Sequence, residues 1–406
     1  MRRVVVTGMA AISPVGKDWK TISKNLKSSN TGIRFMEEWD IYNEMITRLG
    51  APVKDFERPE HFSRKQIRSM GRVALMATAA TEIALEDSQL LNNPIIKDGR
   101  MGVGYGSSTG STEAVKDFGN MLLNKSSVHL NANTYLKMMS HTAAVNIGVF
   151  FGLKGRVIPT SSACTSGSQG IGFSYEAIKY GHQDLMVAGG AEELCPTEAA
   201  VFDTLFATST RNHEPNLTPR PFDRDRDGLV IGEGAATLIL EERDHALKRG
   251  ASIYAEIIGY GCNSDGTHVT RPQADTMYRA MELSLLQSGL EPQSIGYVSA
   301  HGTATDQGDV AESHATNRLL GSNVPISALK SFTGHTLGAC GALEAVVAIN
   351  MMNEGWFHGN ANLENVDPNC AELDYIEPKG RKLESDCIMS NNFAFGGINT
   401  SLIFTK

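Results

Sequence analysis

The chain has few cysteines and no long apolar run, and each absence excludes a class of protein. Six cysteines in 406 residues show neither paired metal-ligand spacing nor the density of a secreted disulfide scaffold. No window approaches the roughly 18 apolar residues of a membrane span, and Gly8 interrupts the first apolar run before it resembles a signal peptide. We therefore expect reduced thiols, a cytoplasmic location and no membrane span.

Long basic runs are also missing. The net charge is −8, with 37 basic and 45 acidic residues interspersed along the chain. No stretch offers the concentrated positive charge that binds nucleic acid or an anionic membrane. The length allows one large domain or two ordinary ones, with a sizeable buried core.

Strand and helix patterns alternate along the chain, which predicts an α/β fold of doubly wound type. Apolar strands are expected at 3–7, 101–105 and 184–194. From residue 253 the pattern restarts, with a strand, a helix at 276–288 and a strand at 295–300. We interpret this as a weak internal duplication, with one half at 1–250 and the other at 251–406.

Two long helices are predicted in the first half, at 63–87 and 133–151. The first has a basic beginning and an alanine-rich end, which is typical of a helix that packs closely against other backbone. The basic beginning of this helix contains Lys65 and Arg68. From the pattern alone, these charges are either a binding surface or a solvated helix face.

Cys164 lies between an extended apolar segment, 156–158, and a run of small residues that opens a helix. A thiol at a helix N-terminus meets the positive end of the helix dipole and unpaired backbone N–H groups, which favour the reactive thiolate. The turn is similar to the strained elbow that presents other nucleophiles. Cys164 is therefore a candidate nucleophile, and a buried, inert thiol is the alternative.

Two histidines, His301 and His335, stand in glycine-flanked motifs after predicted strands. Ligands bind beyond the carboxyl ends of parallel strands, so we expect both rings near Cys164. Structural histidines bonded to backbone are the alternative. No zinc site is predicted, because these residues lack short-range ligand spacing and a fourth ligand. Lys330 and Glu344 flank His335 and either orient it or form a solvated pair.

The segment 391–399, NNFAFGGIN, joins two predicted strands near the C-terminus. The glycine pair after Phe395 permits unusual backbone angles, so a backbone N–H here is a candidate for an oxyanion hole. A plain hairpin turn is the alternative.

Four motifs together form a recognisable set: TSSACTSG (160–167), AHGTATDQGD (300–309), KSFTGHTLGACGALE (330–344) and NNFAFGGIN. Their order and separations resemble those of the beta-ketoacyl-[acyl-carrier-protein] synthases of the elongating, Cys-His-His type, and the resemblance covers essentially the whole chain. It implies the thiolase fold, in which two duplicated α/β halves form a five-layer α-β-α-β-α sandwich.

The resemblance also implies roles for individual residues. Cys164 matches the acyl-accepting nucleophile, His301 and His335 match the decarboxylation pair, and Lys330 matches the lysine that supports them. Glu344 and Asp309 match supporting acidic residues, and Phe395 matches a gating aromatic whose N–H joins that of Cys164 in the oxyanion hole. Thr303 and Thr305 match threonines that contact pantetheine, and Lys65 and Arg68 match basic residues that dock the carrier protein.

The implied reaction is a decarboxylative Claisen condensation. An acyl group carried on Cys164 would join malonyl-acyl carrier protein (ACP), giving 3-oxoacyl-ACP, carbon dioxide and free ACP in fatty acid or polyene and polyketide elongation. No metal or organic cofactor is implied, since phosphopantetheine arrives on the carrier protein. The expected assembly is a homodimer, with a heterodimer containing a chain-length partner as the alternative.

Related activities fit the residues less well. A thiolase needs a second cysteine in a Cys-x-Gly motif, whereas Cys387 is followed by Ile-Met-Ser. An initiating synthase would lack His335, and a non-catalytic chain-length partner would lack Cys164. The gating loop carries Ala394 and Ile398 in place of the usual residues, and the loop 107–111 is unusually polar. A specialised aryl polyene or polyketide system is therefore the alternative to housekeeping fatty acid synthesis.

Overall fold

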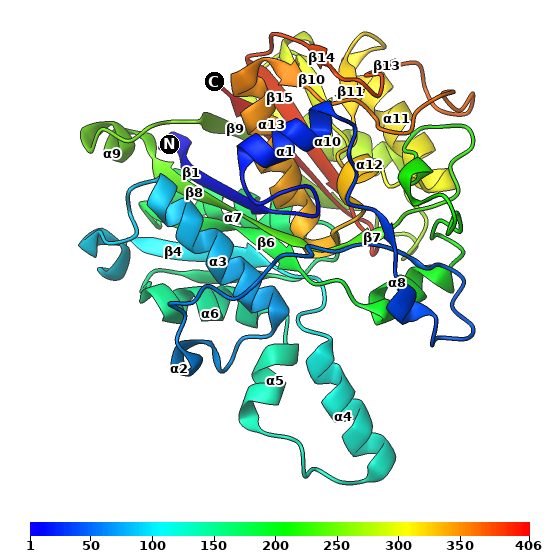
Figure 1. The fold of residues 1–406 in the computed structure, drawn as a ribbon. Coiled ribbons are helices and arrows are strands. Elements are labelled where there is room, and N and C mark those ends of the chain that lie inside the picture. Colours follow the sequence, from blue (N-terminus) through cyan, green and yellow to red (C-terminus); the bar gives the residue numbers. More distant parts are fainter.

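Strand β1 (Val4–Ile12) is buried along its whole length, which explains its nearly continuous apolar sequence. It lies in the middle of an 11-stranded sheet in the computed structural model, which describes residues 1–406 (Figure 1). Val4–Val6 of β1 pair with Ala255–Ile257 of β9 (Ala255–Ser264), and this pairing joins the two halves of the sheet.

The same strand order appears in both halves. In the first, β1 is followed across the sheet by β8 (Gly234–Glu242), β6 (Leu185–Glu192), β4 (Met101–Gly106) and β5 (Val157–Thr160). In the second, β9 is followed by β16 (Ile398–Thr405), β15 (Cys387–Phe393), β10 (Tyr297–Ser299) and β11 (Pro325–Ser327), with β13 (Asp374–Tyr375) added at the edge. Parallel and antiparallel pairings also correspond, so the duplication seen in the sequence pattern is present in the topology.

Helices form three layers around these two half-sheets. Helices α7 (Ser166–Lys179) and α13 (Cys340–Glu354) pack against each other between the halves. Helices α3 (Arg72–Asp87) and α6 (Thr142–Phe151) cover the outer face of the first half. Helix α10 (Ala274–Ser288) covers the second half and packs on α11 (Asp306–Leu320). This is the five-layer arrangement that the resemblance implied.

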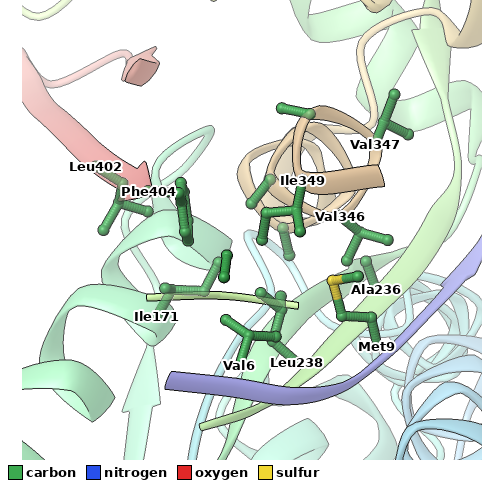
Figure 2. Packing of buried hydrophobic residues seen from close by; sticks show 14 of the residues in the cluster. Val6, Met9, Ile171, Ala236, Leu238, Val346, Val347, Ile349, Leu402 and Phe404 are labelled. Atoms are coloured by element: carbon green, nitrogen blue, oxygen red, sulfur yellow. The ribbon is translucent and has the colours of Figure 1, made fainter. Parts of the chain in front are cut away.

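The central core lies between the two half-sheets. Alternate residues of β8 and β16 point inward, and Figure 2 shows Leu238, Leu402 and Phe404 gathered with Val346 and Ile349 of α13. The intervening residues of these strands belong to the two outer clusters. Because side chains alternate along a strand, each buried strand serves two cores at once.

Each predicted long helix is broken in two. Residues 63–87 form α2 (Arg64–Ile67) and α3, with Gly71 as the N-cap of α3. A side chain at Gly71 would collide with Ser111, so the loop after β4 occupies the space that a continuous helix would need. Residues 133–151 form α5 (Ala132–Met138) and α6, with an extended break at Met139. Tertiary packing overrides local helix propensity at both breaks.

The remaining elements complete the fold, and some of them reach the site. They are α1 (Trp19–Lys27), β2 (Arg34–Phe35), β3 (Leu49–Ala51), α4 (Glu113–Asn124), α8 (Pro196–Asp203), β7 (Ile231–Gly232), α9 (Arg243–Lys248), α12 (Lys330–Thr333), β12 (Trp356–Phe357) and β14 (Arg381–Lys382). Helices α8 and α12 approach the site described below. Helices α4 and α5 project from the body (Figure 1). None of the helices has the length and apolarity to cross a bilayer.

Candidate active site

The turn that carries Cys164 is strained. Strand β5 ends at Thr160 and α7 begins at Ser166, and between them Ala163 has φ 50°. The left-handed region costs a residue with a side chain about 1 kcal/mol or more. The hydroxyl of Ser166 holds the turn by accepting the N–H of Ser162 at 2.9 Å and donating to the carbonyl of Ala163 at 2.7 Å. Cys164 is thereby presented just before the helix, as the sequence predicted.

His335 faces the thiol of Cys164. Its Nε2 lies 3.0 Å from Cys164 Sγ, and its Nδ1 accepts the backbone N–H of Leu337 at 3.2 Å. A ring nitrogen that accepts a hydrogen bond carries no proton in the neutral ring, so the proton of His335 is on Nε2. Leu337 itself has φ 44°, a second strained residue beside the site.

Lys330 fixes the same tautomer in His301, with the proton on Nε2. Its ammonium group donates to Glu344, to the carbonyl of His301 at 2.6 Å and to Nδ1 of His301 at 3.1 Å. These bonds use all of its hydrogens, and an ammonium group cannot accept. Nδ1 of His301 is therefore the acceptor and Nε2 carries the proton. The rings of His301 and His335 meet edge to face at 5.2 Å between centroids.

Burial keeps both histidines neutral. It lowers the pKa of His301 and of His335 well below the usual range, and the charge of Lys330 lowers both further. The ammonium itself stays charged, because Glu344 and its other neighbours raise the pKa of Lys330 despite its burial. The site thus holds two uncharged N–H donors next to one fixed cation.

Cys164 departs from the sequence expectation of a ready thiolate. Burial raises the pKa of the Cys164 thiol to about 11, while Lys330 and the backbone N–H groups of Phe395 and Cys164 lower it by less. The helix N-terminus therefore does not outweigh the desolvation of the buried thiol. The resting group is a neutral thiol beside a neutral imidazole.

The segment after β15 brings a backbone N–H to the sulfur. The N–H of Phe395 acts on Cys164, as does the N–H of Cys164 itself. Neither group takes part in a backbone hydrogen bond, so both are available to a developing oxyanion. The ring of Phe395 stacks on Phe202 of α8 at 5.0 Å between centroids. The loop carries an aromatic side chain at the place where a gate would act.

A cavity of about 530 Å³ opens onto these groups. Cys164, His301 and His335 share its wall with Phe202 and Phe395. Thr303 and Thr305 also line it, and their hydroxyls lie 2.9 Å apart. The volume is in the range of small-molecule sites, so the cavity is large enough for a substrate beside Cys164.

Two of the predicted supporting residues lie outside the reacting centre. The buried carboxylate of Asp309 accepts the N–H groups of Phe222 at 2.7 Å and Ala304 at 3.1 Å, so it shapes the loop after His301. Glu344 holds Lys330 and accepts the amide of Asn392 at 2.6 Å.

The basic pair Lys65 and Arg68 belongs to the surface of the first half. Lys65 lies on α2 and Arg68 is its C-cap residue, and both are exposed. Neither lines the cavity. They are therefore in a position to contact a partner but not the reacting atoms.

Sequence reasoning missed three positioning residues. Glu312 accepts the N–H groups of His301 and Gly302, both at 2.7 Å, and burial raises its pKa to about 8. Asn392 donates to Glu344 and lies 3.4 Å from Nδ1 of His301.

The third missed residue, Glu192, ties the loop after β4 to the loop after His335. It accepts the N–H of Ser108 at 2.6 Å and of Gly338 at 3.1 Å. Two signals were available in the sequence: the paired asparagines that begin the motif NNFAFGGIN, and the paired glutamates that follow Gly-Gly-Ala at 189–191.

The donor set fits hydrogen bonding better than metal binding. Ligand atoms of Cys164, His301 and His335 lie within 4.8 Å of one another, which is close enough for an ion. However, both Nε2 atoms carry protons while the Nδ1 atoms accept from Lys330 and Leu337. A nitrogen that carries its proton has no lone pair for a metal.

Comparisons with known proteins agree with this geometry. The family model described as "Beta-ketoacyl synthase, N-terminal domain" matches residues 1–246, and "Beta-ketoacyl synthase, C-terminal domain" matches residues 254–364. A "3-oxoacyl-[acyl-carrier-protein] synthase 2" from Vibrio cholerae is 40% identical, over 100% of this chain and 99% of the relative. The protein of the same name from Synechocystis sp. is 37% identical, over 100% and 98%.

A solved structure is more similar still. The crystal structure of a beta-ketoacyl synthase from Burkholderia phymatum has a TM-score of 0.99 and 56% identity, and the match covers 100% of both chains. The thiolase fold predicted from the motifs is therefore confirmed. Together these matches show that the chain belongs to the beta-ketoacyl synthase family and is an enzyme of the acyltransferase class.

Proposed function

We propose that this chain elongates acyl chains by condensing an acyl-cysteine with a malonyl thioester carried on acyl carrier protein. One observation carries the proposal: Cys164, His301 and His335 meet in a single cavity, with both imidazole Nε2–H groups available as donors. A non-catalytic partner would have no use for such a nucleophile and two oriented donors.

In the first step, Cys164 accepts the acyl group. Its sulfur attacks the thioester carbonyl, and the N–H groups of Cys164 and Phe395 bind the oxyanion. The bond between the carbonyl carbon and the pantetheine sulfur then breaks. The leaving thiolate takes the proton that Cys164 gives up, so acyl-enzyme and free carrier thiol result.

In the second step, His301 and His335 stabilise an enolate. Their Nε2–H groups donate to the thioester oxygen of the malonyl group while the bond to its carboxylate breaks and carbon dioxide leaves. The electron pair stays on the α-carbon, which attacks the acyl-cysteine carbonyl. The bond between the acyl carbonyl carbon and the sulfur of Cys164 then breaks. The products are a 3-oxoacyl thioester and the Cys164 thiolate, which takes up a proton from solvent. Lys330 acts through His301 as a positioning residue.

No cofactor enters these steps. Each is a proton transfer, a decarboxylation or a displacement at a carbonyl, and the charges that develop are met by N–H donors. Phosphopantetheine arrives with the substrates, and we propose that Thr303 and Thr305, which line the cavity, contact it. The names of the two curated relatives, which specify acyl carrier protein, support that partner.

The proposal includes a homodimer in the cytoplasm. β5 is one edge of the 11-stranded sheet, and Val157 on it is 44% exposed, so this edge offers unpaired backbone groups to a second copy. A chain-length partner could occupy the same edge, and mass measurement of the purified chain alone distinguishes the two assemblies. All six cysteines are free, which supports a reducing compartment.

The test is a coupled assay with acyl-ACP and malonyl-ACP. Mass spectrometry should find an acyl group on Cys164 and a product two carbons longer. Cys164→Ala should abolish condensation, because no acyl acceptor remains. Cys164→Gln should release carbon dioxide without condensing, because the two histidines are intact. Elongation by Cys164→Ala would overturn the proposal.

A further inference from the structure

The thiol of Cys340 is a buried donor that the proposed reaction does not use. Cys340 is the first residue of α13 and is only 1% exposed. Its sulfur lies 3.2 Å from the carbonyl oxygen of Cys164, to which it donates. No backbone N–H donates to that carbonyl. Cys340 therefore supplies a hydrogen bond to the backbone of the nucleophile itself.

The sulfur of Cys340 keeps its proton. Burial raises the pKa of the thiol well above the usual range, and the charge of Glu344 raises it further, although Lys330 lowers it. A protonated thiol has one S–H to donate, and it donates to the carbonyl of Cys164. The amide of Asn392 contacts the same sulfur, with Nδ2 at 3.7 Å. The sulfur thus accepts a weak hydrogen bond from Asn392 while it donates to Cys164.

These contacts connect the nucleophile to the residues of the second step. Nδ2 of Asn392 also donates to Glu344 at 2.6 Å. Glu344 accepts from Lys330, and Lys330 donates to Nδ1 of His301 at 3.1 Å. Hydrogen bonds therefore run from the backbone of Cys164 to the imidazole that stabilises the enolate.

Two other roles for Cys340 do not fit its surroundings. Cys340 does not line the cavity, so a thioester bound there does not meet it as a second nucleophile. Ligand atoms of Cys340, His301 and Glu344 lie within 4.8 Å of one another, a spacing that would suit a metal ion. However, the ammonium group of Lys330 contacts both His301 and Glu344, so a positive charge already takes that place.

The turn around Cys164 is held firmly on one side only by the bonds described above. The hydroxyl of Ser166 bonds to Ser162 and Ala163, and Ala163 has φ 50°. Both bonds lie before Cys164 and leave the following peptide group free. The bond from Cys340 holds the carbonyl of that following group. Because a residue has only two soft backbone angles, holding the peptide groups on both sides fixes where its side chain points.

We propose that Cys340 is a positioning residue for acyl loading, and that its S–H group holds the carbonyl of Cys164 so that the nucleophilic sulfur faces the thioester. This inference rests on the proposed function and adds a residue that acts through the nucleophile. Without the S–H, a buried carbonyl is left unpaired and the strained turn can relax. Acyl loading should slow, because small displacements of a reacting group are costly. Decarboxylation should not, since Asn392 keeps its shorter bond to Glu344.

Three substitutions at Cys340 separate the hydrogen bond from the packing. Cys340→Val fills the space without a donor, Cys340→Ala removes both, and Cys340→Ser keeps a donor in a slightly smaller side chain. Acyl loading of Cys164 from acyl-ACP is measured in a single turnover by mass spectrometry. We expect the valine and alanine variants to load roughly tenfold more slowly. The serine variant should stay within about threefold of the wild-type rate.

Decarboxylation is measured where loading cannot interfere. Malonyl-ACP is supplied to the Cys164→Gln variant with and without Cys340→Ala, and both should release carbon dioxide at the same rate. A merely structural role would instead slow loading and decarboxylation together. Thermal melting identifies any variant that fails to fold, and the serine and alanine variants then carry the comparison.

The outcomes separate the two proposals. If the wild-type enzyme loads no acyl group on Cys164, the proposed function fails. If it loads normally and a folded Cys340→Ala variant loads just as fast, the inference about Cys340 is overturned and the reaction stands. Loading by Cys340→Ser as slow as by Cys340→Val would also overturn it, because the donor would then be irrelevant. An equal loss of decarboxylation in the double variant would have the same meaning.

Discussion

Nζ of Lys330 lies 3.1 Å from Nδ1 of His301, and this contact decides which nitrogen of the ring faces the cavity with a proton. A cation that can only donate turns Nδ1 into an acceptor. Because Glu344 holds the ammonium on its other side, the arrangement does not depend on substrate. His335 reaches the same tautomer by a different route, through the N–H of Leu337.

Removing Lys330 should therefore impair decarboxylation more than acyl loading. In Lys330→Met, His301 is free to place its proton on Nδ1 and present a lone pair to the substrate. We expect the decarboxylation rate to fall by about 100-fold, the usual cost of losing one oxyanion donor. Acyl loading of Cys164, followed by mass spectrometry, should change far less.

The same variant should change histidine titration with a definite sign. The charge of Lys330 lowers the pKa of both histidines, so its removal should raise the pKa of His301 and of His335. NMR titration of the imidazole protons measures this directly. Because the variant leaves Glu344 unpaired and buried, Lys330→Met/Glu344→Gln is the matched control for stability. It should recover folding without recovering activity, and recovered decarboxylation would contradict the assignment.

The thiol of Cys164 should react slowly at neutral pH in the resting enzyme. With a pKa of about 11, its rate of alkylation should rise roughly tenfold per pH unit from pH 7 to pH 9, because thiolate is the nucleophile. A short cysteine peptide should instead level off near its ordinary pKa of about 8.5. Iodoacetamide labelling with peptide mass analysis measures both. A plateau for Cys164 near pH 7 would show that His335 holds the proton in a preformed ion pair.

Gly338 is expected to tolerate no side chain. A Cβ there would lie 2.6 Å from the backbone nitrogen of Ser108 and 2.7 Å from Oε2 of Glu192. Gly338→Ala should lower the free energy of unfolding by about 1–3 kcal/mol and disturb the loop after His335. The matched control is Gly119→Ala within α4, where no atom lies within 4 Å of the new Cβ. That change should stabilise by about 0.5–1 kcal/mol, and urea denaturation compares the two.

The fold was largely predictable because its signals are local and repeated. Buried strands show as apolar runs, and the restart of the pattern near residue 253 corresponds to β9, which repeats the place of β1. The helix breaks at Gly71 and Met139 were not predictable, because neighbouring loops cause them rather than local propensity. A sequence window cannot contain the loop at Ser111 that displaces the chain at Gly71.

The site was predictable where a residue sits in a glycine-flanked motif. Cys164, His301 and His335 stand out in this way, and the structure brings them together. Glu312 was missed because its partners are backbone N–H groups, which leave no mark on residue identity. Glu192 was missed because its partners lie far from it along the chain. The reactivity of Cys164 was misjudged for a related reason, since the helix N-terminus is visible in sequence and the depth of burial is not.

Lys65 and Arg68 should contribute long-range attraction to the carrier protein. The chain has a net charge of −8, so an acidic carrier is repelled overall and needs a local basic surface to dock. Lys65→Glu/Arg68→Glu should raise KM for carrier-bound substrates by about tenfold at low salt. The difference should shrink as salt is added, because the Debye length falls to about 8 Å at physiological ionic strength. Turnover of a small thioester without carrier should not change, since neither residue lines the cavity.

A matched charge reversal makes this prediction specific. Lys20→Glu/Lys248→Glu changes the net charge by the same amount at two exposed lysines on α1 and α9, away from α2. If general repulsion governed the encounter, both double variants would lose affinity equally. If Lys65 and Arg68 form the docking surface, only their reversal should slow association, with a steep dependence on salt. Unchanged carrier affinity for Lys65→Glu/Arg68→Glu at low salt would place the docking surface elsewhere on the molecule.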